Sequence, residues 1–214
     1  MELDEATWKA RLDAGAHEFG FDLDQSQLDT LWRYAHMLRE RNAHVNLTSI
    51  VSLEGILTLH MLDSLSVAKE LGHARRLIDV GTGGGFPGIP LAVACPERDF
   101  MLIDGTQKKI RFVSEAISAL DIRNAHALAA RAESFSGEKN FDVVVARAVG
   151  ALADLVRECA HLLAPRGRLL AMKGRVPDEE LKGLPRGWHG EVIPLRVPGL
   201  DAERHLVVLQ AARR

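Results

Sequence analysis

The sequence predicts an α/β protein whose mostly parallel sheet follows a helical N-terminal extension. Residues 1–72 carry apolar positions at helical spacing, and from Leu77 onward short apolar runs alternate with helical stretches. Such alternation is typical of parallel sheets, whereas two strands with no helix between them pair antiparallel. Two strand-like runs of this second kind lie near the C-terminus. We therefore expect five parallel strands and an antiparallel C-terminal hairpin, with residues 73–214 forming one compact domain after the extension.

The extension is expected to contain three helices. The first covers residues 5–20, the second begins after Asp24 as its N-cap, and the third covers residues 52–72, with Asn46–Ile50 as the connector before it. In the third helix, His60 and Asp63 are three residues apart and can lie side by side. Such a histidine–carboxylate pair is either catalytic or a structural hydrogen bond.

The remaining elements follow from the positions of the apolar runs. The expected strands are residues 77–81, 100–104, 125–129, 141–146 and 167–172. Helices are expected at 89–95, 107–120 and 150–164, with a shorter helical stretch at 131–136. The hairpin is expected to pair residues 191–197 with 205–210 across a turn at Pro198-Gly199.

A glycine-rich loop follows the first of these strands, in the stretch Leu77-Ile-Asp-Val-Gly-Thr-Gly-Gly-Gly-Phe-Pro-Gly88. Glycine adopts positive φ without steric cost and lets a ligand approach the backbone closely. A glycine loop between a strand and a helix N-terminus is the setting in which such loops bind nucleotide-like cofactors. The alternative is a loop that merely turns the chain.

Two cofactors are compatible with this loop. Gly83, Gly85 and Gly88 fit the G-x-G-x-x-G pattern of nicotinamide-binding domains. The order Asp79-x-Gly81-x-Gly83-x-Gly85 instead resembles the first motif of S-adenosylmethionine-dependent methyltransferases. Asp104, at the end of the second strand, is placed to accept hydrogen bonds from ribose hydroxyls in either case. A nicotinamide-dependent oxidoreductase therefore stays open as the alternative at this point.

Composition excludes several other classes. The formal net charge is −2, so any nucleic-acid contact must come from local basic clusters. No apolar run reaches the roughly 18 residues that a membrane span requires, and the acidic N-terminus does not fit a signal peptide. Cys95 and Cys159 lack metal-ligand spacing. We expect a cytoplasmic protein without a metal site.

The fourth strand ends at Arg147, where the cofactor and the acceptor of a doubly wound sheet meet. An Asn-Pro-Pro-aromatic motif, common in enzymes that methylate exocyclic amines, does not occur here, and neither does the Pro-Cys nucleophile of pyrimidine C5 methylation. A ring nitrogen with a free lone pair needs no deprotonation, and an arginine that binds anions and stacks on bases suits such an acceptor. Arg147 is therefore the candidate catalytic residue; the alternative is a surface ion pair.

Several blocks together closely resemble the bacterial small-subunit (16S) ribosomal RNA guanine-N7 methyltransferases, a family also called glucose-inhibited division protein B. The resemblance runs from about residue 25 to the C-terminus. It rests on Asn46-Leu-Thr48, His60-Met-Leu-Asp-Ser64, Asp79–Pro90, Arg147-Ala148, Lys173-Gly174 and Pro198–Val208. It implies a class I methyltransferase fold, S-adenosyl-L-methionine as cofactor, and 16S rRNA in the small subunit or an assembly intermediate as partner. A non-catalytic RNA-binding assembly factor with this fold is the remaining alternative. We expect a monomer.

The resemblance also implies site residues. Contacts to S-adenosylmethionine are carried over to Gly81, Phe86, Ala132, Glu133 and Arg147. Gly83 and Asp104 join them from the loop and ribose arguments above. The substrate candidates are Asn46, Thr48, His60 and Lys173, which fall in family blocks without a role that the sequence reveals.

Overall fold

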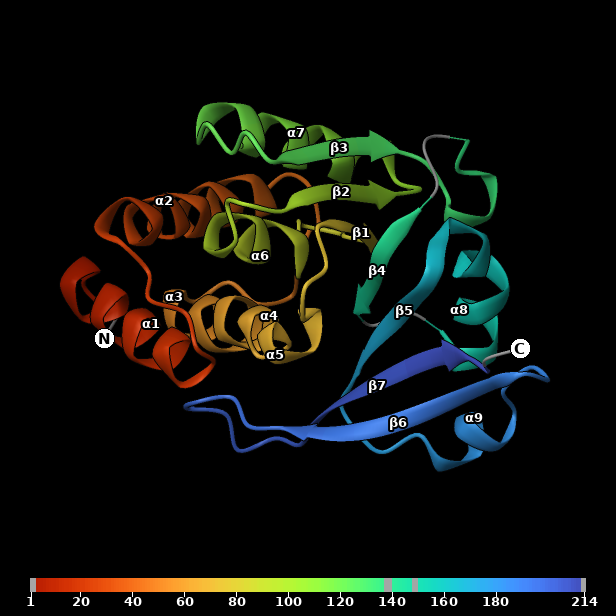
Figure 1. The fold of residues 1–214 in the computed structure, drawn as a ribbon. Helices are drawn as coiled ribbons and strands as arrows, with labels where there is room; N and C mark the ends of the chain where they lie inside the picture. Colours follow the sequence, from red (N-terminus) through yellow and green to blue (C-terminus); the bar gives the residue numbers. More distant parts are fainter. Residues whose placement is uncertain (1–2, 137–139, 148–149, 213–214) are drawn as a thin grey trace.

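The computed structural model describes residues 3–136, 140–147 and 150–212. Its centre is a seven-stranded sheet with the order β3-β2-β1-β4-β5-β7-β6 (Figure 1). The strands are β1 Arg76–Val80, β2 Asp99–Asp104, β3 Ala125–Ala129, β4 Phe141–Arg147, β5 Leu163–Lys173, β6 Trp188–Leu195 and β7 Arg204–Ala211. The α-helices are α1 Glu5–Glu18, α2 Gln25–Asn42, α3 Leu53–Ile56, α4 Asp63–Leu65, α5 Ala68–Leu71, α6 Gly88–Ala94, α7 Gln107–Ala119, α8 Leu152–Cys159 and α9 Asp178–Lys182. A π-helical segment, η1 Leu57–Leu62, and two 3₁₀ turns, η2 Ala132–Ser134 and η3 Ala160–Leu162, complete the elements.

Strand pairing confirms the predicted sheet. β1 pairs in parallel with β2 and β4, β2 with β3, and β4 with β5. β7 lies antiparallel between β5 and β6. The strand order reverses between β1 and β4, and their carboxyl ends are adjacent because Val80 pairs with Ala146. Ligands of open α/β sheets bind at such a reversal point.

The central strands of the sheet, such as β1 and β4, are buried on both faces, which is why they read as continuous apolar runs. Leu77 and Val145 face a core formed with α2, α6 and α7, whereas Ile78 and Val144 face a second core against α8. Figure 1 shows α6 and α7 on one side of the sheet and α8 on the other. Alternate residues of each strand thus serve opposite layers.

The N-terminal helices share the first of these cores. Asp24 caps α2 through a capping box with Gln27, as its sequence position predicts. Trp8 of α1 is fully buried and its indole Nε1 donates to Leu53 O at 2.9 Å. A single apolar cluster runs from Trp8 through the helices to Leu77. The helices are therefore packed onto the sheet by their own apolar faces.

The expected continuous helix at 52–72 is wrong in its interior. The chain forms α3, then the wider π turns of η1, then α4, and a break before α5. Side-chain hydroxyls accompany this irregularity, since Ser64 Oγ donates to His60 O at 2.5 Å and Ser66 Oγ to Asp63 O at 2.6 Å. Ser hydroxyls that bond nearby carbonyls compete with regular helix bonds. Apolar spacing alone does not reveal this competition.

Other boundaries also differ from expectation. The helix expected at 150–164 is α8, which ends at Cys159 and continues only as a 3₁₀ turn, so that β5 begins at Leu163. The stretch at 131–136 forms a single 3₁₀ turn. The register of β4 against β5 shifts between Phe141 and Val143, which lets β5 extend further back than the expected residues 167–172.

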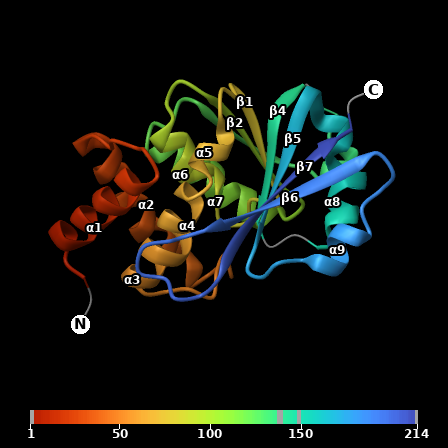
Figure 2. The ribbon, with the colours of Figure 1, turned by 60° about the horizontal axis from the view of Figure 1, so that its bottom comes forward.

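The hairpin tip reaches back to the N-terminal helices. Figures 1 and 2 both show the loop between β6 and β7 passing beside α1 and α3. A Cβ built on Gly199 would lie 3.5 Å from the Arg11 guanidinium and 3.8 Å from Thr58 Oγ1. Val197 and Leu200 pack into the same apolar cluster as Trp8. The hairpin tip and the N-terminal helices therefore stabilise each other.

Candidate functional site

The glycine-rich loop lies at the carboxyl ends of β1 and β2. Gly81 N and Thr82 N both donate to Ile103 O, at 2.9 and 3.0 Å. Gly83 has φ of +60°, and a Cβ built there would meet nothing nearer than Gly81 O at 3.9 Å. The loop therefore presents bare backbone to open space at Gly83, which leaves room for a ligand.

Asp79 lies beneath this loop and is completely buried. Its Oδ2 accepts hydrogen bonds from Thr82 Oγ1 at 2.6 Å and Gly88 N at 2.8 Å. Its Oδ1 is buried and has no hydrogen-bond partner among the described residues. Burial raises the pKa of Asp79 to about 6, although the two hydrogen bonds act in the opposite direction. A buried carboxylate oxygen without a hydrogen-bond partner would be compensated by a positively charged group.

Asp104 anchors the other side of the loop. Its Oδ2 accepts from Gly83 N at 3.0 Å and its Oδ1 from Thr106 N at 2.7 Å. An ionised carboxylate has about four acceptor positions, so ribose hydroxyls can still bind the remaining ones. Asp104 thus serves both to shape the loop and to present acceptors at the strand end.

Ala132 and Glu133 lie on the 3₁₀ turn that follows β3, the strand whose Ala129 pairs with Asp104. Ala130 N donates to Asp104 O at 3.2 Å, and the 3₁₀ turn that follows contains both residues. Ala132 is buried, whereas Glu133 is exposed and lies 3.7 Å from the Arg131 guanidinium.

Phe86 is the aromatic centre of the site. Its ring is 3% exposed and stacks on His60, with centroids 4.4 Å apart and an angle of 22° between the planes. The Arg147 guanidinium carbon lies 5.1 Å from the same ring centroid. Tyr34 of α2 approaches Phe86 from the core and donates its hydroxyl to Gly84 O. Burial raises the pKa of Tyr34 well above its usual value, so this hydroxyl remains a donor.

Arg147 is held by the π-helical segment. Its Nη1 donates to Leu59 O at 2.9 Å and lies 3.3 Å from Asp63 Oδ2, while Nη2 lies 3.3 Å from His60 Nδ1. Its side chain is only 20% exposed. The pairing is thus largely buried, which differs from the surface ion pair that sequence reasoning kept as the alternative.

His60 and Asp63 have different partners in the structure. His60 Nε2 lies 2.7 Å from Thr48 Oγ1, whereas Asp63 Oδ1 accepts from Arg204 Nε at 3.0 Å. Both contact Arg147, so the guanidinium joins them. Burial, together with the nearby charge of Arg147, lowers the pKa of His60 to about 4. The imidazole is therefore uncharged near neutral pH.

The other two substrate candidates lie apart from this cluster. Lys173, at the end of β5, donates from Nζ to Gly150 O at 2.8 Å and pairs with Glu180 Oε2 at 2.9 Å. Glu180 also accepts from Leu152 N, at the start of α8. Lys173 therefore ties three segments together. Asn46 is exposed on the connector.

The two cysteines are free and buried. Burial raises the pKa of Cys95 to about 11 and that of Cys159 to about 12, so both thiols stay protonated. Within the described ranges, no group of three or more His, Cys, Asp or Glu side chains could hold a metal ion. In the same part of the chain, no helix is long and apolar enough to cross a membrane.

Sequence reasoning did not single out three contributors to this site. Asp79 enters the sequence prediction only through the glycine motif, although its position inside an apolar strand indicates a buried carboxylate. Arg204 lies in the C-terminal block, and its pairing with Asp63 spans 141 residues. Tyr34 falls on the buried face of α2 with no sequence signal that separates it from ordinary core.

A doubly wound sheet with a glycine loop after β1, an acid after β2 and an antiparallel C-terminal pair defines a class I methyltransferase. Solved structures agree on the fold. An S-adenosylmethionine-dependent O-methyltransferase from Thermotoga maritima is similar with a TM-score of 0.56 and 16% identity, covering 83% of this chain and 72% of that one. An S-adenosylmethionine-dependent methyltransferase from Aquifex aeolicus is similar with a TM-score of 0.56 and 18% identity, covering 74% of this chain and 93% of that one.

Sequence comparison specifies the family. The family model GidB, described as rRNA small subunit methyltransferase G, matches residues 27–207. Ribosomal RNA small subunit methyltransferase G of Methylococcus capsulatus is 47% identical over 200 residues, which is 93% of this chain and 97% of that protein. The protein of the same name from Cupriavidus necator is 42% identical, with 96% of each chain covered. This chain belongs to the rRNA small subunit methyltransferase G family and is an enzyme of the methyltransferase class. These matches do not favour the nicotinamide-dependent oxidoreductase.

Proposed function

We propose that this protein transfers a methyl group from S-adenosyl-L-methionine to guanine N7 in the 16S rRNA of the small ribosomal subunit. The observation that carries the proposal is the set Asp79, Gly83, Asp104 and Arg147 at the reversal point of the sheet, in a chain of this family. The N7 position rests on the family resemblance and on the chemistry of the site.

The residues present fit the donor. Asp104 offers acceptors to the ribose hydroxyls, and Gly83 leaves the backbone open where the donor passes. The free Oδ1 of Asp79 offers negative charge to a cationic ligand. The other residues that we propose to line the donor site are Gly81, Phe86, Ala132, Glu133 and Arg147. When bound, S-adenosylmethionine supplies an electrophilic methyl group on a positively charged sulfur.

The reaction requires alignment more than acid–base catalysis. The N7 lone pair forms the new C–N bond while the C–S bond breaks, and no proton leaves the nitrogen. Holding the two reactants in line can supply an effective molarity of about 10⁵–10⁸ M. Arg147, fixed by Leu59 O and Asp63, presents a rigid planar cation at the strand end for this alignment.

The proposed setting follows from the substrate. We propose that the enzyme acts as a monomer in the cytoplasm, on RNA within a small subunit or an assembly intermediate. The candidates for contact with the RNA substrate, on the acceptor side of the site, remain Asn46, Thr48, His60 and Lys173. Lys173 would have to exchange Glu180 for a phosphate in order to contact RNA directly.

The proposed function is tested with labelled S-adenosylmethionine and small subunits from a strain that lacks this methyltransferase. Incorporation into 16S rRNA, followed by nucleoside analysis, should give N7-methylguanosine. A different methylated nucleoside would refute the N7 assignment. Tight RNA binding without transfer would refute the enzymatic proposal and favour an assembly factor.

A further inference from the structure

Thr48 and His60 form a contact that the proposed reaction does not itself explain. Thr48 lies on the connector between α2 and α3, and its Oγ1 also accepts from Ile50 N at 3.0 Å. Asn42 holds the same turn, with its Oδ1 accepting from Thr48 N at 2.9 Å and its Nδ2 donating to Thr48 O at 2.8 Å. The connector is thus rigid where it meets His60, although Asn46 and Val51 beside it are exposed.

His60 touches two of the proposed donor-site residues, Phe86 and Arg147. Its ring stacks on Phe86 and its Nδ1 lies 3.3 Å from Arg147 Nη2. The ring is 7% exposed, so its position is set by packing as well as by hydrogen bonds. The π-helical turn of η1 places Leu59 O within 2.9 Å of both His60 Nδ1 and Arg147 Nη1. Such π turns occur frequently at functional sites.

Each of the two neutral tautomers of the imidazole satisfies the Thr48 contact and one of the two contacts at Nδ1. In one, Nδ1–H donates to Leu59 O and Nε2 accepts from the Thr48 hydroxyl. In the other, Nδ1 accepts from Arg147 and Nε2–H donates to Thr48 Oγ1. The lowered pKa of His60 favours the uncharged ring in either arrangement, which avoids repulsion between His60 and the guanidinium.

We propose that His60, oriented by the Thr48 hydroxyl, is a positioning residue that sets the Phe86 ring and the Arg147 guanidinium for donor binding. Through Thr48 it connects the exposed connector to the donor site. This inference rests on the proposed donor site and assigns these two acceptor-side candidates an indirect role. In consequence, removing one hydroxyl outside the donor site should alter the affinity for the donor.

The experiment compares Thr48→Val, which loses the hydroxyl but keeps the shape, with Thr48→Ser, which keeps the hydroxyl. The donor affinity of each is measured by calorimetry with S-adenosylmethionine. We expect Thr48→Val to weaken binding about tenfold and Thr48→Ser to remain within about twofold of wild type. The matched control is Thr30→Val, which removes a hydroxyl bonded to Ser26 O on α2; it should bind the donor normally.

A second variant separates stacking from hydrogen bonding. His60→Phe keeps an aromatic ring against Phe86 but removes both nitrogens, and it should weaken donor binding as Thr48→Val does. In steady-state kinetics the KM for the donor should rise while that for the small subunit stays within about twofold. If Thr48→Val and His60→Phe both bind the donor like wild type, the inference is overturned. Binding is measured without RNA, so a failure of the proposed RNA substrate would be seen separately in the transfer assay.

Discussion

Gly83 is the residue over which we propose that the donor binds. Its φ of +60° lies in the left-handed region, and the space above its Cα is open. A side chain there imposes two separate penalties, one on the backbone and one on the ligand. Gly20 has φ of +88° and equally open space, but it lies at the end of α1, away from the site.

These two glycines make a matched pair for mutation. Gly83→Ala and Gly20→Ala should each lower the free energy of unfolding by about 1–2 kcal/mol, because alanine is strained at positive φ. Only Gly83→Ala should also weaken S-adenosylmethionine binding, by about tenfold or more. Urea denaturation and calorimetry check the two effects. Equal donor binding by the two variants would contradict the placement of the donor over Gly83.

Asp79 makes stability depend on pH in a way that can be isolated. Its pKa is about 6 in the folded protein and 3.8 in the unfolded chain, so the folded state holds the proton more tightly. The contribution of Asp79 to the free energy of unfolding is fully present below about pH 4 and is lost as the pH rises through about 6. The free energy of unfolding falls by roughly 3 kcal/mol over this range. Retaining a carboxylate at this cost is typical of functional sites.

Asp79→Asn should remove this dependence. The amide oxygen can still accept from Thr82 and Gly88, while the buried charge is gone. The variant should therefore gain stability relative to wild type between about pH 4 and 7 and bind cationic S-adenosylmethionine more weakly. Urea denaturation at several pH values measures the first effect and calorimetry the second. Parallel stability curves would show that Asp79 does not titrate in this range.

At the scale of elements, Asp63 joins three segments that are distant in sequence. It extends from the end of the π turns to Arg147 of β4 and Arg204 of β7. The Asp63 side chain is 4% exposed. Loss of its carboxylate therefore leaves the positive charges of Arg147 and Arg204 poorly compensated. Breaking such a buried pair is far more costly than breaking an exposed one.

Asp63→Asn should accordingly destabilise the fold by about 3 kcal/mol, near the lower end for buried pairs. The control is Asp154→Asn, whose partner Arg157 is 65% exposed; it should change stability by about 0.5 kcal/mol or less. Thermal and urea unfolding check both variants. Comparable losses in the two would show that solvent screens the Asp63 pairs as effectively as it does those at the surface.

The same elements show what a sequence can reveal. The strands and the hairpin are predictable because buried strands are apolar runs and the glycine loop marks the end of β1. The π turns around His60 are not, because the contacts that accompany them come from a serine hydroxyl and from an arginine 87 residues away. Arg147 and Asp104 could be placed at strand ends by topology. Their actual partners could not, since those are fixed by packing between remote segments.

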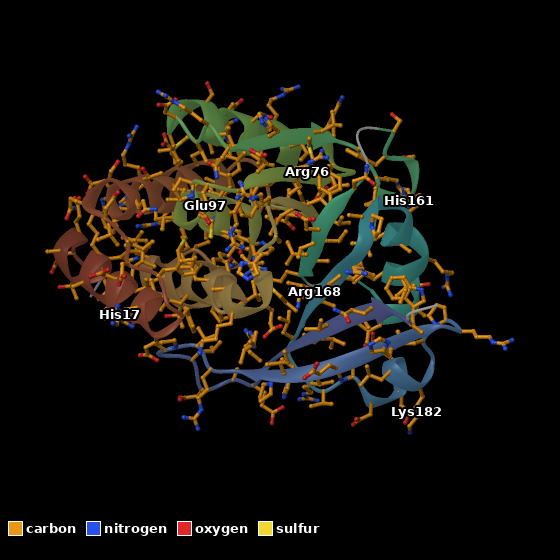
Figure 3. The ribbon with its side chains drawn as sticks, viewed as in Figure 1. His17, Arg76, Glu97, His161, Arg168 and Lys182 are labelled. Atoms are coloured by element: carbon orange, nitrogen blue, oxygen red, sulfur yellow. The ribbon has the colours of Figure 1, made fainter. Side chains whose placement is uncertain are left out.

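At the scale of the whole molecule, the basic residues do not form one continuous region of positive charge. Arg76 begins β1, and Arg168 lies in the middle of β5 where that strand pairs with Val143 of β4, whereas Lys173 ends β5. The Arg168 side chain, labelled in Figure 3, donates to Glu70 O at 2.6 Å, so part of its charge stabilises the fold. With a net charge of −2 and 5% aromatic residues, the protein is poorly equipped to grip arbitrary single-stranded RNA.

We therefore expect a pre-folded substrate to be preferred. Methyl transfer to intact small subunits should exceed transfer to a short hairpin with the same guanine by at least about tenfold, and it should fall as salt rises. Protein-free rRNA is the intermediate case that separates the RNA fold from ribosomal proteins. Equal transfer to the hairpin would show that the local sequence is sufficient.

The position of β7 between β5 and β6 has a consequence for synthesis of the protein. β6 is made before β7, yet it pairs with β7 in the sheet order and not with β5. While the chain is being translated, the edge of β5 therefore stays unpaired until β7 has emerged. Over the same period Asp63 lacks its partner Arg204. An open strand edge is prone to pair with other chains. The nascent chain is thus exposed to aggregation at this edge until β7 has emerged, which is the stage at which a chaperone would protect it.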